Sequence, residues 1–278
     1  MKWTIRTYGD SELVAESGRR VVGRWVWSAL PGGAVLVVDR SADEPEIDAA
    51  LASAAVERFR SDDVRFAQLT MSPQIDPPQH LIAAGFHPLT ELVEYRRPTQ
   101  TETALLPRGL SLEPIRKLTS ADLKTVWDET LIDTLDCPEL NDCRGPSGLP
   151  AGFDDPRADA DAPSSAAILH GRCVGIIFGK IRAIESIAEI HYLGVIPAVR
   201  RSGIASVLLS HFPSSSGVAA AVETTVAVDA RNDPARRLYE RNLFRSYGSY
   251  RVWVWINSST SRPIHFPGKS GVLRRRAR

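Results

Sequence analysis

The sequence is poor in cysteine, has almost no net charge and contains no long apolar run. Its three cysteines, Cys137, Cys143 and Cys173, form neither an even set nor a CxxC pair, so we expect reduced thiols and no metal site. The net charge of +1 gives no overall field that would favour nucleic acid or a membrane as partner. Charges in MKWTIRTYGDSEL interrupt any signal-peptide core, which predicts a cytoplasmic protein without a membrane span.

The 278 residues are enough for two modest domains. Two strand-rich halves flank a polar stretch, so we expect domains over 1–98 and 110–257, a linker over 99–109 and a disordered basic tail over 258–278. Apolar, β-branched runs of strand length alternate with amphipathic helical patterns. The fold class predicted is α/β or α+β with a mixed sheet.

The two halves share one pattern of elements. In each, a strand is followed by a proline-started helix, a turn that ends in phenylalanine and a last strand. Phe86 and Tyr95 have the same separation as Phe244 and Trp253, which suggests an internal duplication. The first copy has Leu81 where the second has Tyr239, and no Arg-x-x-Gly follows its VLVVD strand. We therefore expect the first copy to keep a fold and to have lost the chemistry.

The stretch VIPAVRRSGIA, residues 195–205, joins a strand to a helix and predicts an anion site. Free N–H groups and the positive dipole end at a helix start bind phosphate oxygens. Gly203 permits a tight turn and a close approach to the backbone, and Arg200 and Arg201 add positive charge. Neither GxxxxGK[ST] nor GxGxxG occurs. The alternative is that the arginines lie in a solvated loop.

Two motifs together resemble the GNAT superfamily of N-acetyltransferases. RRSGIA, residues 200–205, fits the element [QR]-x-x-G-x-[GA], and NDPARRLYER, residues 232–241, resembles N-x-x-A-x-x-L-Y. The resemblance covers about residues 110–256, with a degenerate form over 1–98. It implies two GNAT-like domains, each a mixed, mostly antiparallel twisted sheet flanked by helices, with a splayed parallel strand pair in the second domain.

The resemblance also implies a binding site for acetyl-coenzyme A. The strand that ends Leu193, Gly194 and Val195 would pair with the pantetheine arm, although Gly194 could instead only relieve packing. Asn232 would contact pantetheine or cap the next helix. The diphosphate would lie on the loop formed by Arg200, Arg201, Ser202, Gly203, Ile204 and Ala205.

Three residues are candidates for catalysis. A neutral amine is needed for attack on the thioester, so a base is required. Glu189 lies where many family members have their catalytic glutamate, and His191 could share the task. Strand alternation would put Glu189, His191, Leu193 and Val195 on one face of the strand. Tyr239 would protonate the departing thiolate; the alternative is a core aromatic residue.

The acceptor side of this fold corresponds to residues 131–145, which are acidic. Asp133 and Asp136 would attract a cationic amine and Asn141 could add a hydrogen bond, so a small-molecule or peptide amine is the expected acceptor. The alternative is a solvated acidic loop. The sequence leaves open the acceptor's identity, the length of the acyl group and the oligomeric state.

One departure from the family pattern affects the helix that carries Tyr239. The family has glycine before the phenylalanine of its Gly-Phe turn, where this chain has Leu243, so we expect a differently shaped helix exit. That departure and the decayed first copy leave a rival function open, a non-catalytic acyl-coenzyme A sensor or scaffold. The basic tail alone motivates nucleic-acid binding, and a short basic end is usually solvated.

Overall fold

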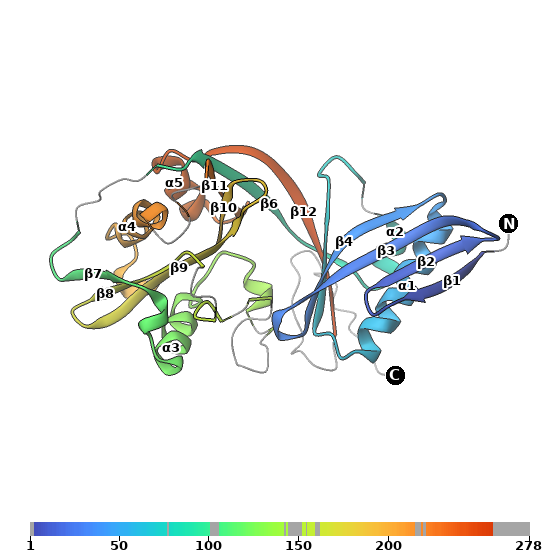
Figure 1. Ribbon diagram of the computed structural model, residues 1–278, viewed down its shortest axis with the longest axis horizontal. Helices are drawn as coiled ribbons and strands as arrows, with labels where there is room; N and C mark the ends of the chain where they lie inside the picture. The colour runs from blue at the N-terminus through green and yellow to red at the C-terminus, as the bar shows by residue number, and fades with distance from the viewer. Residues whose placement is uncertain are drawn as a thin grey trace, which may run out of the picture.

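The fold is built on one continuous sheet of twelve strands (Figure 1). The computed structural model describes residues 3–76, 78–100, 106–141, 143, 152–153, 155–158, 162–214, 218 and 221–257. The predicted tail over 258–278 and part of the predicted linker lie outside these residues. The strand order is β1-β2-β3-β4-β5-β12-β6-β11-β10-β9-β8-β7. The predicted mixed α/β fold is confirmed, with two parallel pairs, β4/β5 and β10/β11.

The first half of the chain forms six strands and two helices. The helix α1 begins with a proline in its first turn, where the missing N–H costs no hydrogen bond. The elements are β1 (Thr4–Tyr8), β2 (Glu12–Ser17), β3 (Arg20–Leu30), β4 (Ala34–Ala42), α1 (Pro45–Ser61), β5 (Phe66–Met71), α2 (Gln79–Ala83) and β6 (His87–Pro98).

The second half repeats this order and adds one helix, α3, after its first strand. Thr119 caps α3 by accepting a hydrogen bond from the backbone N–H of Asp122 at 3.1 Å. The elements are β7 (Leu110–Glu113), α3 (Ser120–Thr130), β8 (Ser164–Leu169), β9 (Arg172–Arg182), β10 (Ile187–Val195), α4 (Ile204–His211), β11 (Glu223–Asp229), α5 (Asp233–Arg241) and β12 (Arg245–Ile256).

The two halves exchange their last strands. β6, the end of the first half, pairs with β11 of the second half, and β12, the end of the chain, pairs with β5 of the first half. β6 and β12 also pair with each other, and both run through the middle of the molecule in Figure 1. Nothing in the periodicity of the sequence indicates this exchange, because a strand pattern does not identify its partner.

Each half therefore has a core completed by the other. Trp253 and Trp255 of β12 are buried in the core of the first half, among α1, α2 and strands β2–β5. Tyr95 of β6 is buried in the core of the second half.

Among the described residues, no helix combines the length and the hydropathy that a membrane span requires.

The helix exit at Leu243 differs from our expectation. Leu243 adopts the left-handed conformation, φ 64°, that Gly85 has in the first copy, φ 95°. The next residue makes the same hydrogen bond in both copies: Phe86 N–H donates to Leu81 at 2.9 Å, and Phe244 N–H donates to Tyr239 at 3.0 Å. The exit therefore has the ordinary shape. A non-glycine residue in this conformation costs roughly 1–2 kcal/mol.

The strand exchange predicts that neither half folds alone. Residues 1–98 expressed separately would lack β12, so Trp253 and Trp255 would be missing from their core and β5 would have a free edge. We expect fragments 1–98 and 99–278 each to lack a cooperative unfolding transition and to regain one when co-expressed. Circular dichroism melts of the two fragments, the co-purified pair and the intact chain measure this.

A fragment 1–98 that unfolds cooperatively by itself, with a melting temperature close to that of the intact chain, would contradict this prediction.

Candidate active site

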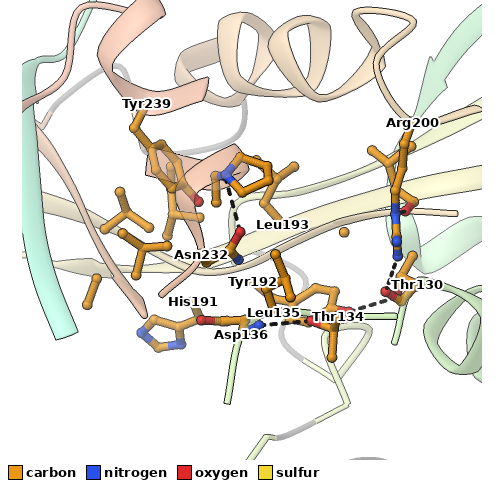
Figure 2. Close-up of a pocket in the computed structure, with 18 of the residues that line it drawn as sticks. Thr130, Thr134, Leu135, Asp136, His191, Tyr192, Leu193, Arg200, Asn232 and Tyr239 are labelled. Atoms are coloured by element: carbon orange, nitrogen blue, oxygen red, sulfur yellow. Dashed lines mark hydrogen bonds between the residues drawn. The ribbon is translucent and has the colours of Figure 1, made fainter. Parts of the chain in front are cut away.

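The site begins where two parallel strands stop pairing. β10 and β11 are in register from Ile187 opposite Glu223 to Ile190 opposite Val226, and the pairing ends there. Beyond this point β10 still pairs with β9 as far as Val195, while β11 still pairs with β6. A pocket of about 230 Å³ opens between the diverging strands, and Figure 2 shows its lining side chains. The splayed pair expected from the sequence is present.

A β-bulge at His191 changes which residues share a face of β10, and our expected alternation is wrong. The register with β9 shifts between Ile190 and Tyr192, so one residue is extra. Ile190 pairs with Gly179, and a Cβ added to Gly179 would lie 2.9 Å from Phe212, the residue that follows α4. Ile190 and Gly179 are therefore on the α4 face of the sheet. Tyr192 stacks on Phe178 and packs against α3.

The bulge divides the predicted residues between the two faces. Glu189, next to Ile190, lies on the α3 face together with Tyr192 and Gly194. Val195 lies on the opposite, α4 face, next to Leu208. A Cβ on Gly194 would approach Thr130 Cβ and the Tyr192 ring at 2.8 Å, so packing against α3 explains this glycine.

The predicted anion loop leads into α4 as expected. Arg201 and Gly203 have left-handed backbone conformations, φ 63° and 89°, which turn the chain into the helix. No side chain caps the N-terminus of α4, and Arg201, Ser202 and Gly203 are exposed. Ile204 is buried in the core and Ala205 is half-buried. The helix start therefore presents backbone N–H groups to solvent.

Arg200 has a different role from the one expected of a free cation. Its guanidinium donates to three backbone oxygens: Val195 O at 3.0 Å, Thr130 O at 3.0 Å and Ile132 O at 2.7 Å. Figure 2 shows the bond to Thr130. These bonds tie the end of β10 to the end of α3. Arg200 lines the pocket, but the exposed charge at the loop comes from Arg201.

Tyr239 is buried and also faces the pocket. It lies on α5, packed between Tyr95 of β6 and Phe244, with ring centroids at 5.9 and 5.5 Å. Burial raises the pKa of its phenol well above the ordinary value, with a smaller contribution from Asp136. It is thus a neutral O–H donor at physiological pH. Its packing is that of a core aromatic residue, and its role toward the departing thiolate stays a prediction.

Asn232 caps α5 and lines the same pocket. Its side-chain oxygen accepts a hydrogen bond from Ala235 N–H at 3.2 Å. Leu193 and Val195 line the opposite wall. Asn232 thus caps α5, which is one of its two expected roles, and it lies at the pocket where the other role, contact with pantetheine, stays a prediction.

Glu189 and His191 lie together near the mouth of the gap. Their side chains are half-exposed, with His191 Nε2 at 3.7 Å from Glu189 Oε2. The hydrogen bond with His191 lowers the pKa of Glu189 although burial opposes it. His191 lines the pocket; Glu189 is not among its lining residues.

The acidic loop after α3 is fixed by an ion-pair network that sequence reasoning missed. The Arg231 guanidinium binds Glu139 at 2.6 Å and the fully buried Asp229 carboxylate at 2.6 Å. Thr90 of β6 and the Cys137 N–H also donate to Asp229. Burial by itself would raise the pKa of Asp229, but these hydrogen bonds outweigh it and the pKa is lowered.

The predicted acceptor residues occupy different places around this loop. Asp133 is exposed at the pocket edge, and Asp136 lines the pocket and accepts a hydrogen bond from Asp229 N–H at 3.2 Å. The residue as a whole is exposed, but desolvation of its carboxyl group and the negative charge of Asp229 raise the pKa of Asp136. Asn141 lies in a neighbouring cavity.

Three donor atoms here fall within metal-binding distance of one another. A carboxylate oxygen each of Asp136 and Asp229 and the Cys137 sulfur lie within 4.8 Å. Both Asp229 oxygens are already hydrogen-bonded to Arg231, and burial keeps Cys137 a neutral thiol by raising its pKa. The cluster therefore serves to hold the loop on β11.

Comparison with known proteins assigns this part of the chain. A family model described as Acetyltransferase (GNAT) family matches residues 130–243. A search of curated proteins finds no match.

Solved structures resemble the whole chain. A GCN5-related N-acetyltransferase from Sphaerobacter thermophilus is 14% identical, with a TM-score of 0.62, and the match covers 90% of this chain and 82% of that one. A tandem GNAT protein from the clavulanic acid biosynthesis pathway is 16% identical, with a TM-score of 0.55 and coverage of 88% and 82%. A GCN5-related N-acetyltransferase from Kribbella flavida is 13% identical, with a TM-score of 0.51 and coverage of 91% and 89%. These likenesses show that the chain has the fold of GNAT proteins, and residues 130–243 match the model of the GNAT acetyltransferase family.

Proposed function

We propose that the protein is an N-acetyltransferase that transfers an acetyl group from acetyl-coenzyme A to a primary amine by direct attack. One observation carries the proposal: the gap between β10 and β11 has an uncapped helix start beside it and a phenol in its wall. Bound acetyl-coenzyme A would supply an activated thioester to this gap.

The residues around the gap fit that donor. Arg201, Ser202 and Gly203 with the first amides of α4 would hold the diphosphate, because the helix start offers N–H groups and positive potential. Along β10, the backbone of residues 193–195 is paired with β9 on one side only. Its other side would receive the pantetheine arm, with Asn232 opposite.

Proton transfer requires a base beside the attacking amine. Glu189 was expected to act, but its lowered pKa makes it a weak base and it does not line the gap. Asp136 lines the gap, and its raised pKa makes it the better proton acceptor. We assign the proton to Asp136, with His191 at the same pocket as the relay to solvent.

Two donors complete the reaction. A strand N–H near Leu193 would stabilise the negative oxygen that develops on the carbonyl, where loss of one such donor costs about 10²–10³ in rate. Tyr239 would give its proton or a hydrogen bond to the departing thiolate, since within the described part of the chain its hydroxyl makes no other hydrogen bond.

Charge reversal at Arg201 tests the anion loop. Arg201→Glu places a carboxylate where the diphosphate would lie, so we expect coenzyme A to bind about tenfold or more weakly, or about 1.4 kcal/mol. Isothermal titration with coenzyme A measures this. Arg19→Glu, the same reversal at an exposed turn of the first half, is the control and should bind normally. Equal affinities in the two variants would refute the loop assignment.

Removal of one hydroxyl tests Tyr239. Tyr239→Phe keeps the ring contacts with Tyr95 and Phe244, so we expect normal coenzyme A affinity and a turnover reduced on the order of 10²-fold. Release of coenzyme A thiol from acetyl-coenzyme A and an amine panel is the assay, with the exposed Tyr247→Phe as control. Thiol release that no amine stimulates in the wild type would favour a sensor over an enzyme.

The pH profile tests Asp136. The carboxylate must be ionised to accept a proton, so kcat/KM should fall as pH drops through its pKa, which burial places above the ordinary aspartate value of about 3.9. The neighbours that act on this pKa are Asp229 and Arg231. Asp136→Asn should remove this acidic limb together with most of the activity. If the acidic limb of the kcat/KM profile persists in Asp136→Asn and disappears in Glu189→Gln, the base is Glu189 and not Asp136.

A further inference from the structure

A second cavity adjoins the gap on the α3 face of β10. It also measures about 230 Å³, and its walls are mainly apolar. Three aromatic side chains of the second half form one side: Trp127 of α3, Tyr192 of β10 and Phe153 of the loop before β8. Their ring centroids lie 5.1–6.0 Å apart, so these walls are in mutual contact.

The first half of the chain forms the other side. Leu30 at the end of β3, with Phe66 and Gln68 of β5, lines the cavity. The two sides are joined by backbone, because Gly152 N–H donates to Pro31 O at 2.8 Å. Buried Cys143 packs with Phe66 and Ala34. The decayed copy thus contributes a wall that the second half alone does not have.

The two cavities meet at Asp136. Thr134, Asp136 and Tyr192 line both of them. Within the described lining of the second cavity Asp136 is the one carboxylate, and Cys137 is a neutral thiol. Glu139 is neutralised by Arg231 behind the loop. Among its described lining residues, the second cavity therefore offers one carboxylate for a cation, at its junction with the gap. The rest of the lining is mainly apolar, with the neutral side chains of Gln68 and Asn141 among it.

We propose that the acceptor is a primary amine on an apolar body of arylalkylamine size, with the body in this second cavity and the amino group at Asp136. The inference rests on the proposed function and narrows the small cationic acceptor expected from the acidic loop. A dry cavity of about 150 Å³ holds a benzene ring. A cavity of about 230 Å³ therefore has room for a phenyl ring with a short alkyl arm.

The same walls disfavour polar amines. A second ammonium group in this cavity would meet no second carboxylate among the described lining residues, and several hydroxyls would lie mostly against apolar walls such as Trp127, Phe153 and Leu30. Burying such groups without hydrogen bonds is costly. Selection against diamines and amino sugars therefore follows from the lining.

A matched amine panel tests the proposal on the wild-type protein. We expect kcat/KM for 2-phenylethylamine, measured by thiol release, to exceed that for 1,4-diaminobutane and for glucosamine about tenfold or more. Equal or higher values for the two polar amines would overturn it. Binding of coenzyme A, measured separately by titration, shows whether the proposed function stands: no binding and no release with any amine refutes that function itself.

A variant in the first half tests the shared wall. Leu30→Trp should fill part of the cavity, lowering kcat/KM for 2-phenylethylamine about tenfold while methylamine turnover and coenzyme A affinity stay unchanged. Val38→Trp, at an exposed site of the same half, is the control. A thermal melt checks the fold of both variants. A folded Leu30→Trp that retains the wild-type preference between the two amines would overturn the proposal.

Discussion

The structure depends on one interruption of backbone pairing. The bulge at His191 lets β10 keep its bonds to β9 while its register with β11 ends at Ile190. Because the chain gains one residue there, Tyr192 turns toward α3 and Val195 toward α4. The same irregularity thus lies beside the gap between β10 and β11 and turns Tyr192 into the aromatic wall of the neighbouring cavity.

The exchange of last strands makes that gap a property of the whole chain. β11 is held on its outer side by β6, which belongs to the first copy. From the same strand Tyr95 packs against Tyr239, and Thr90 donates to Asp229 beside the acidic loop. Residues 87–98 thus support β11 at one side of the gap, pack against Tyr239 and hold Asp229 beside the acidic loop. The RRSGIA motif, residues 200–205, lies far from them in the sequence.

What could be predicted from the sequence was local. Helix caps, the turn at Gly203 and the spacing of Asn232 and Tyr239 are set by neighbouring residues. Asn232, Tyr239 and Leu193 line one pocket, whereas Glu189 and Asn141 do not. The sequence did not predict the bulge, the strand exchange or the partners of Arg200 and Arg231. These features depend on residues far apart in the sequence, and a strand edge or an arginine can form hydrogen bonds with many different partners. Glu139 belongs to the acidic stretch 131–145 that was expected to attract a cationic acceptor, but its carboxylate is paired with Arg231 of the same chain.

The first copy explains its own loss of the cofactor motif. Its parallel pair β4/β5 also stops early, after Leu36 opposite Gln68, so the geometry of a gap is retained. The helix that follows β4 has Glu46 and Asp48 in its first turn, and the Asp48 carboxylate binds Trp25 and His80 within the first half. The start of this helix is therefore used internally. Gln68, at the very point where a first gap would open, faces instead the cavity proposed for the acceptor. The first half therefore keeps its sheet, and at the point where its own parallel strands stop pairing it lines the cavity next to the gap between β10 and β11.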